Sequence, residues 1–280
     1  MPLSIRDAHQ QFIQSLDHLY GLGEAKSMAR IVFEDEFQIR NFQRQDILNE
    51  KAIHHLNRIR DRLLAEEPLQ YILGMADFYG HRFQVNPSVL IPRQETEELV
   101  AWLVALFRDG PPMRLLDIGT GSGCIAISLK KELPQMEVVA IDKSEAALQV
   151  AQANAQFLNV DVDFRRSDIL DHSAWVTLGP FDLVVSNPPY IPDSEKVLMP
   201  KHVLAHEPDL ALFVNDADAL LFYKTIAQFA KEYCKRQLFF ECNEYNAQEL
   251  LLYMQEMGFG AVDLRKDMQG KDRMMRIYLT

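Results

Sequence analysis

The stretch from Arg114 to Ile127 limits what this chain can fold into more than any other. It reads Arg-Leu-Leu-Asp-Ile-Gly-Thr-Gly-Ser-Gly-Cys-Ile-Ala-Ile, so an apolar strand runs directly into a glycine-rich turn that opens a helix. This is the first half of a dinucleotide-type βα unit, whose glycines let a ligand approach the backbone. A full dinucleotide fingerprint has a glycine at the position of Cys124, whereas here the third glycine, Gly123, comes one residue earlier. The stretch therefore predicts an α/β fold with a ligand at this turn, and it argues against NAD.

A second strand follows at 137–142 and ends in Asp142. This acid lies roughly 20 positions after the first glycine, the spacing of a residue that binds ribose hydroxyls. Taken alone, Asp142 is equally explained as a solvated acid at a strand end. Further strands at 162–165 and 181–187 complete a βαβαβ run and add a fourth strand, as in half of a doubly wound, mostly parallel sheet.

Residues 181–190 read Phe-Asp-Leu-Val-Val-Ser-Asn-Pro-Pro-Tyr. Two consecutive prolines end the strand because neither can donate to a sheet ladder, so Asn187 lies at its carboxyl end, where ligands bind in open α/β sheets. The fixed φ angles hold the carbonyls of Asn187 and Pro188 and the ring of Tyr190 rigidly. An amide, two fixed acceptors and an aromatic wall suit a planar NH2 group. On its own, the motif is also explained as a stiff turn.

The residues before this α/β region predict a separate helical domain. Residues 4–67 have helical periodicity only, with Ser4 as an N-cap, a turn at the glycines at 21 and 23, and helices over 25–37 and 44–67, the latter divided in two if Asn49 interrupts it.

Residues 69–93 change character and predict a hairpin linker. Its strands at 76–79 and 82–85 are joined by Gly80-His81 in a type II′ turn. We therefore expect a helical domain at 1–68, a linker at 69–93 and the α/β domain at 94–280.

The rest of the α/β domain alternates helices with strands. A helix that begins after Arg93 directs Leu99, Leu103 and Leu106 inward. The charged residues at its start are explained about equally well by a functional role or by a favourable interaction with the helix dipole. A long polar segment runs from 191 to about 218, and such loops are usually lids or disordered. The remaining predicted elements are helices at 219–233 and 247–257 and strands at 237–242 and 274–279.

Charge and cysteine spacing exclude several classes of protein. The net charge of −11 disfavours a protein whose main partner is a phosphate backbone. The three cysteines have no paired metal spacing, so we expect reduced thiols and no metal. The first residues lack a basic-then-apolar signal, and no run reaches the ~18 apolar residues of a membrane span. We expect a cytoplasmic monomer without a membrane partner.

Four motifs in this order resemble the class I S-adenosylmethionine-dependent amino-group methyltransferases: the glycine turn, Asp142, Ser167-Asp168 and Asn187-Pro-Pro-Tyr. Within that class, the chain is similar to the release factor glutamine methyltransferases over nearly its whole length. The segments that carry this similarity are 69–74, 91–97, 186–191 and 267–273. The sequence departs from the family pattern at Gln94, at Asn215-Asp216 and at Cys242-Asn243.

The resemblance implies a Rossmann-like methyltransferase domain that uses S-adenosylmethionine. The residues implied to bind this cofactor are Gly119, Thr120, Gly121, Ser122 and Gly123 at its methionine end, Asp142 at its ribose, Asp168 and Ile169 at its adenine, and Asn187. The acceptor glutamine would be held by Asn187, Pro188, Pro189 and Tyr190, of which Asn187, Pro188 and Tyr190 are the implied catalytic residues. The implied substrate is the glutamine of the Gly-Gly-Gln motif in peptide chain release factors, with the helical domain as a docking element.

Two other functions remain as alternatives. A methyltransferase acting on an exocyclic amine of DNA or RNA would present the same planar NH2 group, but it must accept an unstacked base and bind phosphates. The net charge and the lack of a basic tract with interleaved aromatic residues argue against it. A non-catalytic cofactor-binding module would not need intact motifs at both the cofactor and the acceptor ends.

Overall fold

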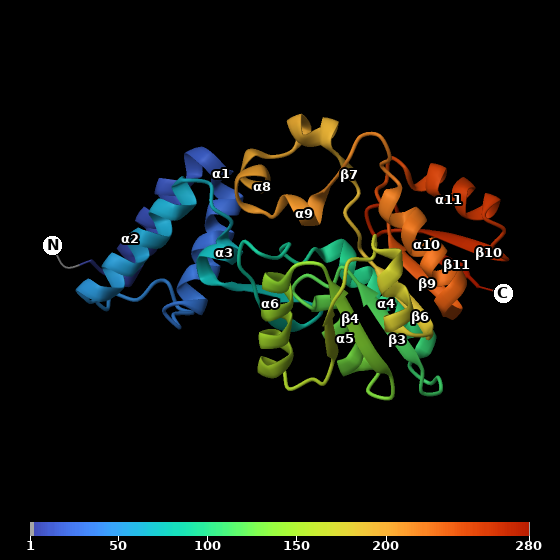
Figure 1. Cartoon of the computed structure of the whole chain (residues 1–280). Helices are drawn as coiled ribbons and strands as arrows, with labels where there is room; N and C mark the ends of the chain where they lie inside the picture. The colour runs from blue at the N-terminus through green and yellow to red at the C-terminus, as the bar shows by residue number, and fades with distance from the viewer. Residues whose placement is uncertain (1–2, 280) are drawn as a thin grey trace. The chain divides into compact units, whose positions relative to one another are not determined.

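The computed structural model describes residues 3–279 (Figure 1). The chain forms two compact units, one that runs to Gly74 and includes Pro200–His206, and a larger one made of Met75–Met199 and the residues from Glu207 on. The segment 69–74, predicted as part of the linker, thus belongs with the helical unit, and the hairpin belongs with the larger unit.

The smaller unit is helical. Its helices are α1 (Ile5–Asp35), α2 (Glu50–Leu64), α3 (Leu69–Leu73) and α8 (Lys201–His206). The predicted cap is confirmed, because the Ser4 side chain accepts a hydrogen bond from the Asp7 N–H. The predicted turn is a kink within α1, where Gly21 has φ 79° and ψ 155°. The prediction of helix from residue 44 is wrong, because Asn49 caps α2 and so ends the non-helical segment before it.

A seven-stranded sheet forms the centre of the larger unit, in the order β10-β11-β9-β6-β3-β4-β5. Its strands are β3 (Arg114–Ile118), β4 (Glu137–Asp142), β5 (Asp163–Arg166), β6 (Phe181–Ser186), β9 (Cys234–Glu241), β10 (Ala261–Lys266) and β11 (Asp272–Tyr278). Neighbouring strands are parallel except where β11 pairs with β9 and with β10. The predicted mostly parallel α/β fold is confirmed. β10 was not predicted, because it is an edge strand with no fully buried residue and so has no apolar run.

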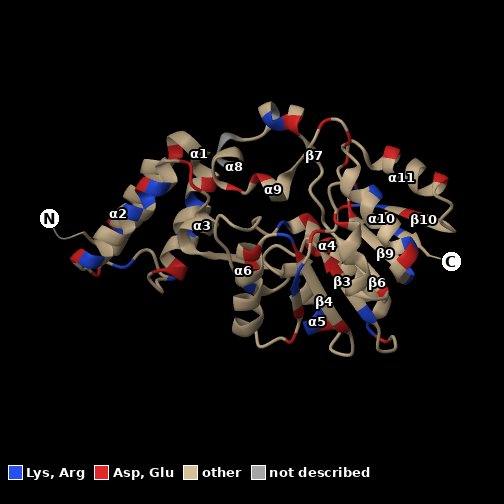
Figure 2. Ribbon diagram, viewed as in Figure 1, with Lys and Arg blue, Asp and Glu red and all other residues tan. Residues whose placement is uncertain are grey.

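Helices cover both faces of this sheet (Figure 1). They are α4 (Gln94–Phe107), α5 (Cys124–Glu132) and α6 (Glu145–Phe157) on one face, and α7 (Trp175–Leu178), α10 (Leu221–Tyr233) and α11 (Ala247–Glu256) on the other. Successive residues of β3 divide between the two cores: Leu115 packs with α4 and α5, and Leu116 packs with α10 and α11. Leu99 and Leu103 of α4 are buried as predicted, but Leu106 is 38% exposed. Figure 2 shows acidic residues at the start of α4, where their negative charge interacts favourably with the helix dipole.

The hairpin precedes α4 and has a different turn from the predicted one. Its strands are β1 (Met75–Phe78) and β2 (His81–Gln84), so the loop is Tyr79-Gly80. Both loop residues have positive φ, 49° and 74°, which is the type I′ geometry rather than type II′. This register buries Phe78 in the core of the larger unit, and the Tyr79 N–H donates to Glu97 at 2.9 Å. Long-range packing therefore selects a turn that a tyrosine rarely adopts.

The segment predicted as a long polar loop is built from short elements. After α8, which belongs to the helical unit, come α9 (Asp209–Leu212) and β8 (Phe213–Val214). β8 pairs in parallel with β7 (Ile191–Pro192), and a 3-10 helix follows β7 at Asp193–Leu198. The buried Glu207 side chain accepts hydrogen bonds from Arg93 at 2.5 Å and from the Ile91 N–H at 3.3 Å. These hydrogen bonds join the segment before α9 to the residues just before α4.

Candidate active site

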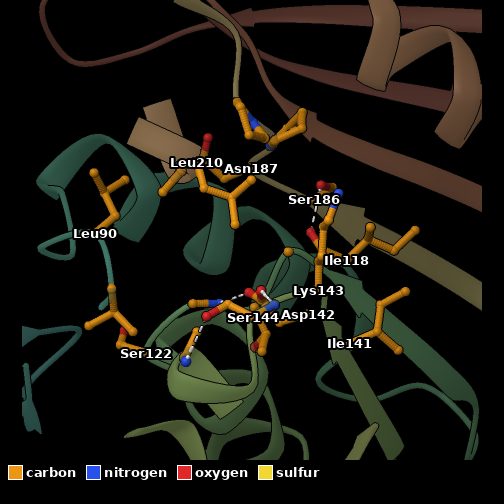
Figure 3. Close-up of a pocket in the computed structure, with 18 of the residues that line it drawn as sticks. Leu90, Ile118, Ser122, Ile141, Asp142, Lys143, Ser144, Ser186, Asn187 and Leu210 are labelled. Carbon is orange, nitrogen blue, oxygen red and sulfur yellow. Dashed lines mark hydrogen bonds between the residues drawn. The ribbon is translucent and has the colours of Figure 1, made fainter. Parts of the chain in front are cut away.

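A cavity of about 300 Å³ opens at the carboxyl ends of β3, β4 and β6 (Figure 3). This is the edge at which ligands bind in open α/β sheets. Figure 3 shows Asp142 and Ser144 on one side of the cavity and Asn187 on another, with Leu90 and Leu210 bordering the space between. The motifs that follow three different strands therefore meet at one place.

The glycine turn after β3 forms one wall. The N–H groups of Gly119 and Thr120 both donate to the Ile141 carbonyl, at 2.9 and 3.0 Å, and so fix the turn against β4. Gly119 and Gly121 have φ of 75° and 56°, and a Cβ on either would meet no atom within 4 Å. These two glycines are required by backbone conformation, and they leave open space beside the ligand.

Gly123 has a different role. Its φ is 81°, but a Cβ there would lie 2.9 Å from Ile127 and 3.2 Å from Ala151. It therefore allows α5 and α6 to approach closely. It does not border the cavity, although the family resemblance implied that it binds the cofactor. Ser122 and Thr120 do border it.

Below the turn, Asp117 is fully buried. The Thr120 hydroxyl donates to its carboxylate at 2.7 Å. Burial raises the pKa of Asp117 to about 7, although the Thr120 hydrogen bond acts in the opposite direction. Its charge state therefore depends on pH in the folded protein.

Asp142 connects the glycine turn to the next helix. One carboxylate oxygen accepts from the Gly121 N–H at 2.9 Å, and the other accepts from the Ser144 N–H at 2.8 Å. Burial raises its pKa, against the effect of these hydrogen bonds. The predicted N-cap of α6 is also present, since the Ser144 side chain accepts from the Ala147 N–H. Asp142 is thus held rigidly with its side chain at the cavity wall.

Residues 167–169 form the side of the cavity beyond β5. Asp168 pairs with Lys143 at 2.8 Å and accepts from the Leu170 N–H at 3.0 Å. Ile169 is 5% exposed and borders the cavity with its apolar side chain. The buried Ser167 hydroxyl also borders it and has no hydrogen-bond partner within residues 3–279. This hydroxyl is therefore available to hydrogen-bond a polar ligand in the cavity.

At the end of β6, the partly buried Asn187 amide joins a hydrogen-bond chain to two buried side chains. Its Nδ2 donates to the Thr96 hydroxyl at 3.2 Å, and that hydroxyl donates to the Glu241 carboxylate at 2.6 Å. Asn187, Pro188 and Pro189 line the cavity. Tyr190 packs on the core formed by α10 and α11 instead, and burial raises its pKa. A neutral Tyr190 cannot act as a base near pH 7.

Thr96 and Glu241 are functional candidates that the residue patterns did not single out. Glu241 ends β9 and is 2% exposed, and burial raises its pKa to about 7. An acid at the carboxyl end of a buried strand was a signal for it. Thr96 had only its place in the segment 91–97 as a signal.

Comparisons with known proteins agree with this site. The family model described as "Methyltransferase small domain" matches residues 96–211. A release factor glutamine methyltransferase from Flavobacterium psychrophilum is 39% identical over 282 residues, which cover 98% of each chain. Another, from Bacteroides thetaiotaomicron, is 41% identical over 269 residues, which cover 94% of this chain and 95% of that protein. The chain belongs to the release factor glutamine methyltransferase family.

The predicted family is therefore confirmed, and with it the expectation that the chain is an enzyme of the methyltransferase class. A solved structure of a methyltransferase from Pyrococcus furiosus has the same fold, with a TM-score of 0.51 and 17% identity over 79% of this chain and 97% of that one. Among the described residues of this methyltransferase, no helix has the length and apolar character needed to cross a membrane. The roles of the individual site residues stay predictions, which we develop below.

Proposed function

We propose that this methyltransferase transfers a methyl group from S-adenosylmethionine to the side-chain amide nitrogen of the glutamine in the Gly-Gly-Gln motif of peptide chain release factors. The observation that carries the proposal is the orientation of Asn187. Its amide nitrogen is engaged by Thr96, which leaves the amide oxygen for the cavity. An acceptor beside fixed proline carbonyls suits a substrate NH2 group, and the similar proteins carry names that specify glutamine.

The cavity lining offers polar groups that suit S-adenosylmethionine. Asp142 would accept hydrogen bonds from the ribose hydroxyls, and Ser167 with Asp168 would meet the polar edge of the adenine beside Ile169. The glycine turn would lie along the methionine end, where Gly119 and Gly121 leave space. When bound, the cofactor supplies an electrophilic methyl group on a sulfonium.

The protein's own task is to align a poor nucleophile. The lone pair of a carboxamide nitrogen is delocalised, and the barrier of ~18–20 kcal/mol to rotation about the amide bond gives the scale of that resonance. If the Asn187 side-chain oxygen and the Pro188 carbonyl each accept one N–H of the glutamine, the nitrogen lone pair points at the methyl carbon. Alignment of two bound reactants can lower a barrier by roughly 7 to 11 kcal/mol. No strong base is needed, because the proton can leave after the methyl group arrives.

The same site could in principle accept an exocyclic amine of DNA or RNA, and family membership does not favour that alternative. The net charge of −11 also opposes binding to a phosphate backbone. We further propose that the helical unit docks the release factor and that the enzyme acts in the cytoplasm, where translation ends.

The proposal is tested by incubating the enzyme with labelled S-adenosylmethionine and with release factor, DNA or RNA in parallel. We expect label in the release factor alone, and none when its Gly-Gly-Gln glutamine is replaced by alanine. Asn187→Ala should lower the single-turnover rate by about 10² to 10³, the usual contribution of one positioned hydrogen-bond partner, with cofactor affinity nearly unchanged. Label in nucleic acid, or an alanine variant at the parent rate, would overturn the assignment.

A further inference from the structure

Two buried side chains, Thr96 and Glu241, and the partly buried side chain of Asn187 form a hydrogen-bond chain that ends at the acceptor amide. Glu241 lies 145 residues from Thr96, and Thr96 lies 91 residues from Asn187. Thr96 is 3% exposed and Glu241 2% exposed, so water does not compete for the hydrogen bond between them. Thr96 and Glu241 must therefore find their donors and acceptors among protein groups.

The direction of each hydrogen bond follows from the chemistry of its members. A carboxylate only accepts, so Thr96 gives its single hydroxyl proton to Glu241. The Thr96 oxygen is then an acceptor, and it must face the NH2 group of Asn187 rather than the carbonyl oxygen. The amide oxygen is consequently turned the other way, toward the cavity that Asn187 lines.

We infer that Glu241 is a positioning residue that orients the catalytic amide of Asn187 through the Thr96 hydroxyl, and that this orientation requires Glu241 to be ionised. A protonated Glu241 can donate to Thr96, which frees the hydroxyl proton for the Asn187 oxygen. The amide then turns over and presents NH2 to a substrate that also presents NH2. Because this inference rests on the proposed function, its test includes a measurement that needs no methyl transfer.

The groups around Glu241 decide where it ionises. The Thr96 hydrogen bond, the charge of Arg273 and the nearby Asn187 NH2 group favour the charged form of Glu241, and Glu95 opposes it. Burial outweighs them and raises the pKa of Glu241 to about 7.

Two further neighbours bear on the same carboxylate. The charge of Glu241 contributes to raising the pKa of the Tyr190 phenol, which stays neutral. Tyr223 donates its hydroxyl proton to the Glu241 backbone carbonyl at 3.0 Å, and Cys242 is a buried neutral thiol whose pKa is raised by burial. Glu241 is thus the group in this cluster that changes charge near neutral pH. Methyl transfer should fall as the pH is lowered through this range.

The kinetic test uses Thr96→Val, Thr96→Ser and Glu241→Gln in the full chain, with saturating cofactor and release factor. Valine keeps the shape of Thr96 but removes the hydroxyl, so kcat should fall about 10- to 100-fold, the range seen when a metal ligand loses its supporting hydrogen-bond partner. Serine restores the hydroxyl and should recover most of that loss. Glu241→Gln should lower kcat to a similar extent and remove the decline of kcat at low pH. Thr225→Val is the matched control, because Thr225 is a buried threonine of α10 whose hydroxyl donates to the Leu221 carbonyl of the same helix, and the rate of this variant should match the parent.

The second measurement follows the side-chain amide of Asn187 by nitrogen-15 NMR in the free enzyme. Its signal, assigned by its loss in Asn187→Ala, should titrate with a midpoint near that of the kcat profile and stop titrating in Glu241→Gln. Absence of labelled release factor would count against the proposed function, whereas the amide titration would still decide this inference. A Thr96→Val rate equal to the parent, or an Asn187 amide that titrates unchanged in Glu241→Gln, would overturn it. A lower melting temperature with a parental kcat would show that Thr96 has only a structural role.

Discussion

Alanine at Gly123 should mainly lower stability, whereas alanine at Gly119 should mainly weaken ligand binding. Gly123→Ala places a Cβ 2.9 Å from Ile127 and 3.2 Å from Ala151 at a φ of 81°. The left-handed backbone costs about 1–2 kcal/mol and overpacking costs about 1–3 kcal/mol, so the free energy of unfolding should fall by about 2–5 kcal/mol. Gly119→Ala has a similar φ of 75° but meets no atom within 4 Å, so it should cost only the first amount, about 1–2 kcal/mol.

Ligand affinity should show the reverse pattern. Gly119 borders the cavity, so its new methyl group would occupy ligand space and weaken S-adenosylmethionine binding. Gly123 does not border the cavity, so the cofactor affinity of a folded Gly123→Ala protein should be within a few-fold of that of the parent.

Both tryptophans, Trp102 and Trp175, belong to the larger unit, so their fluorescence during urea unfolding reports on that unit. Titration calorimetry at a temperature where each variant is folded gives the affinity. Equal losses of stability for the two variants would refute the packing role of Gly123. A loss of affinity confined to Gly123→Ala would refute the division of roles within the turn.

Three other outcomes are expected. Asp142→Ala should weaken cofactor binding by about 1–3 kcal/mol, because the ribose hydroxyls lose a charged acceptor; unchanged affinity by calorimetry would remove Asp142 from the site. The pKa of Asp117 rises from 3.8 to about 7 on folding, so the native state holds the proton more tightly and stability falls as pH rises between these values. Asp117→Asn should flatten that slope in urea midpoints measured from pH 4 to 7, and an unchanged slope would contradict the buried-acid explanation. Deleting residues 1–67 should preserve cofactor binding but impair methylation of intact release factor, and full activity of the truncated enzyme would rule out a docking role.

The sequence by itself determined the features that depend on neighbouring residues. A buried strand that ends in glycines or prolines has few conformations available, so the turn after β3 and the end of β6 at Asn187 could be predicted from their residues. The strand periodicity and the position of Asp142 placed three motifs at one edge of a parallel sheet. The Ser4 cap was predictable for the same reason, since its partner is three residues away.

The tertiary structure decided what depends on partners far along the chain. Local preference favoured a glycine-first hairpin loop, but burial of Phe78 shifted the register by one residue and put Tyr79 at positive φ. The local pattern of Gly123 is that of a ligand-binding glycine, but in the fold Ala151 of α6 packs against it. The contacts of Thr96 with Asn187 and Glu241 exist only because β9 lies beside β6 and α4 packs near both, an arrangement set by strand order. No local pattern encodes such a meeting, because each side chain gains its hydrogen-bond partner only after the sheet has assembled.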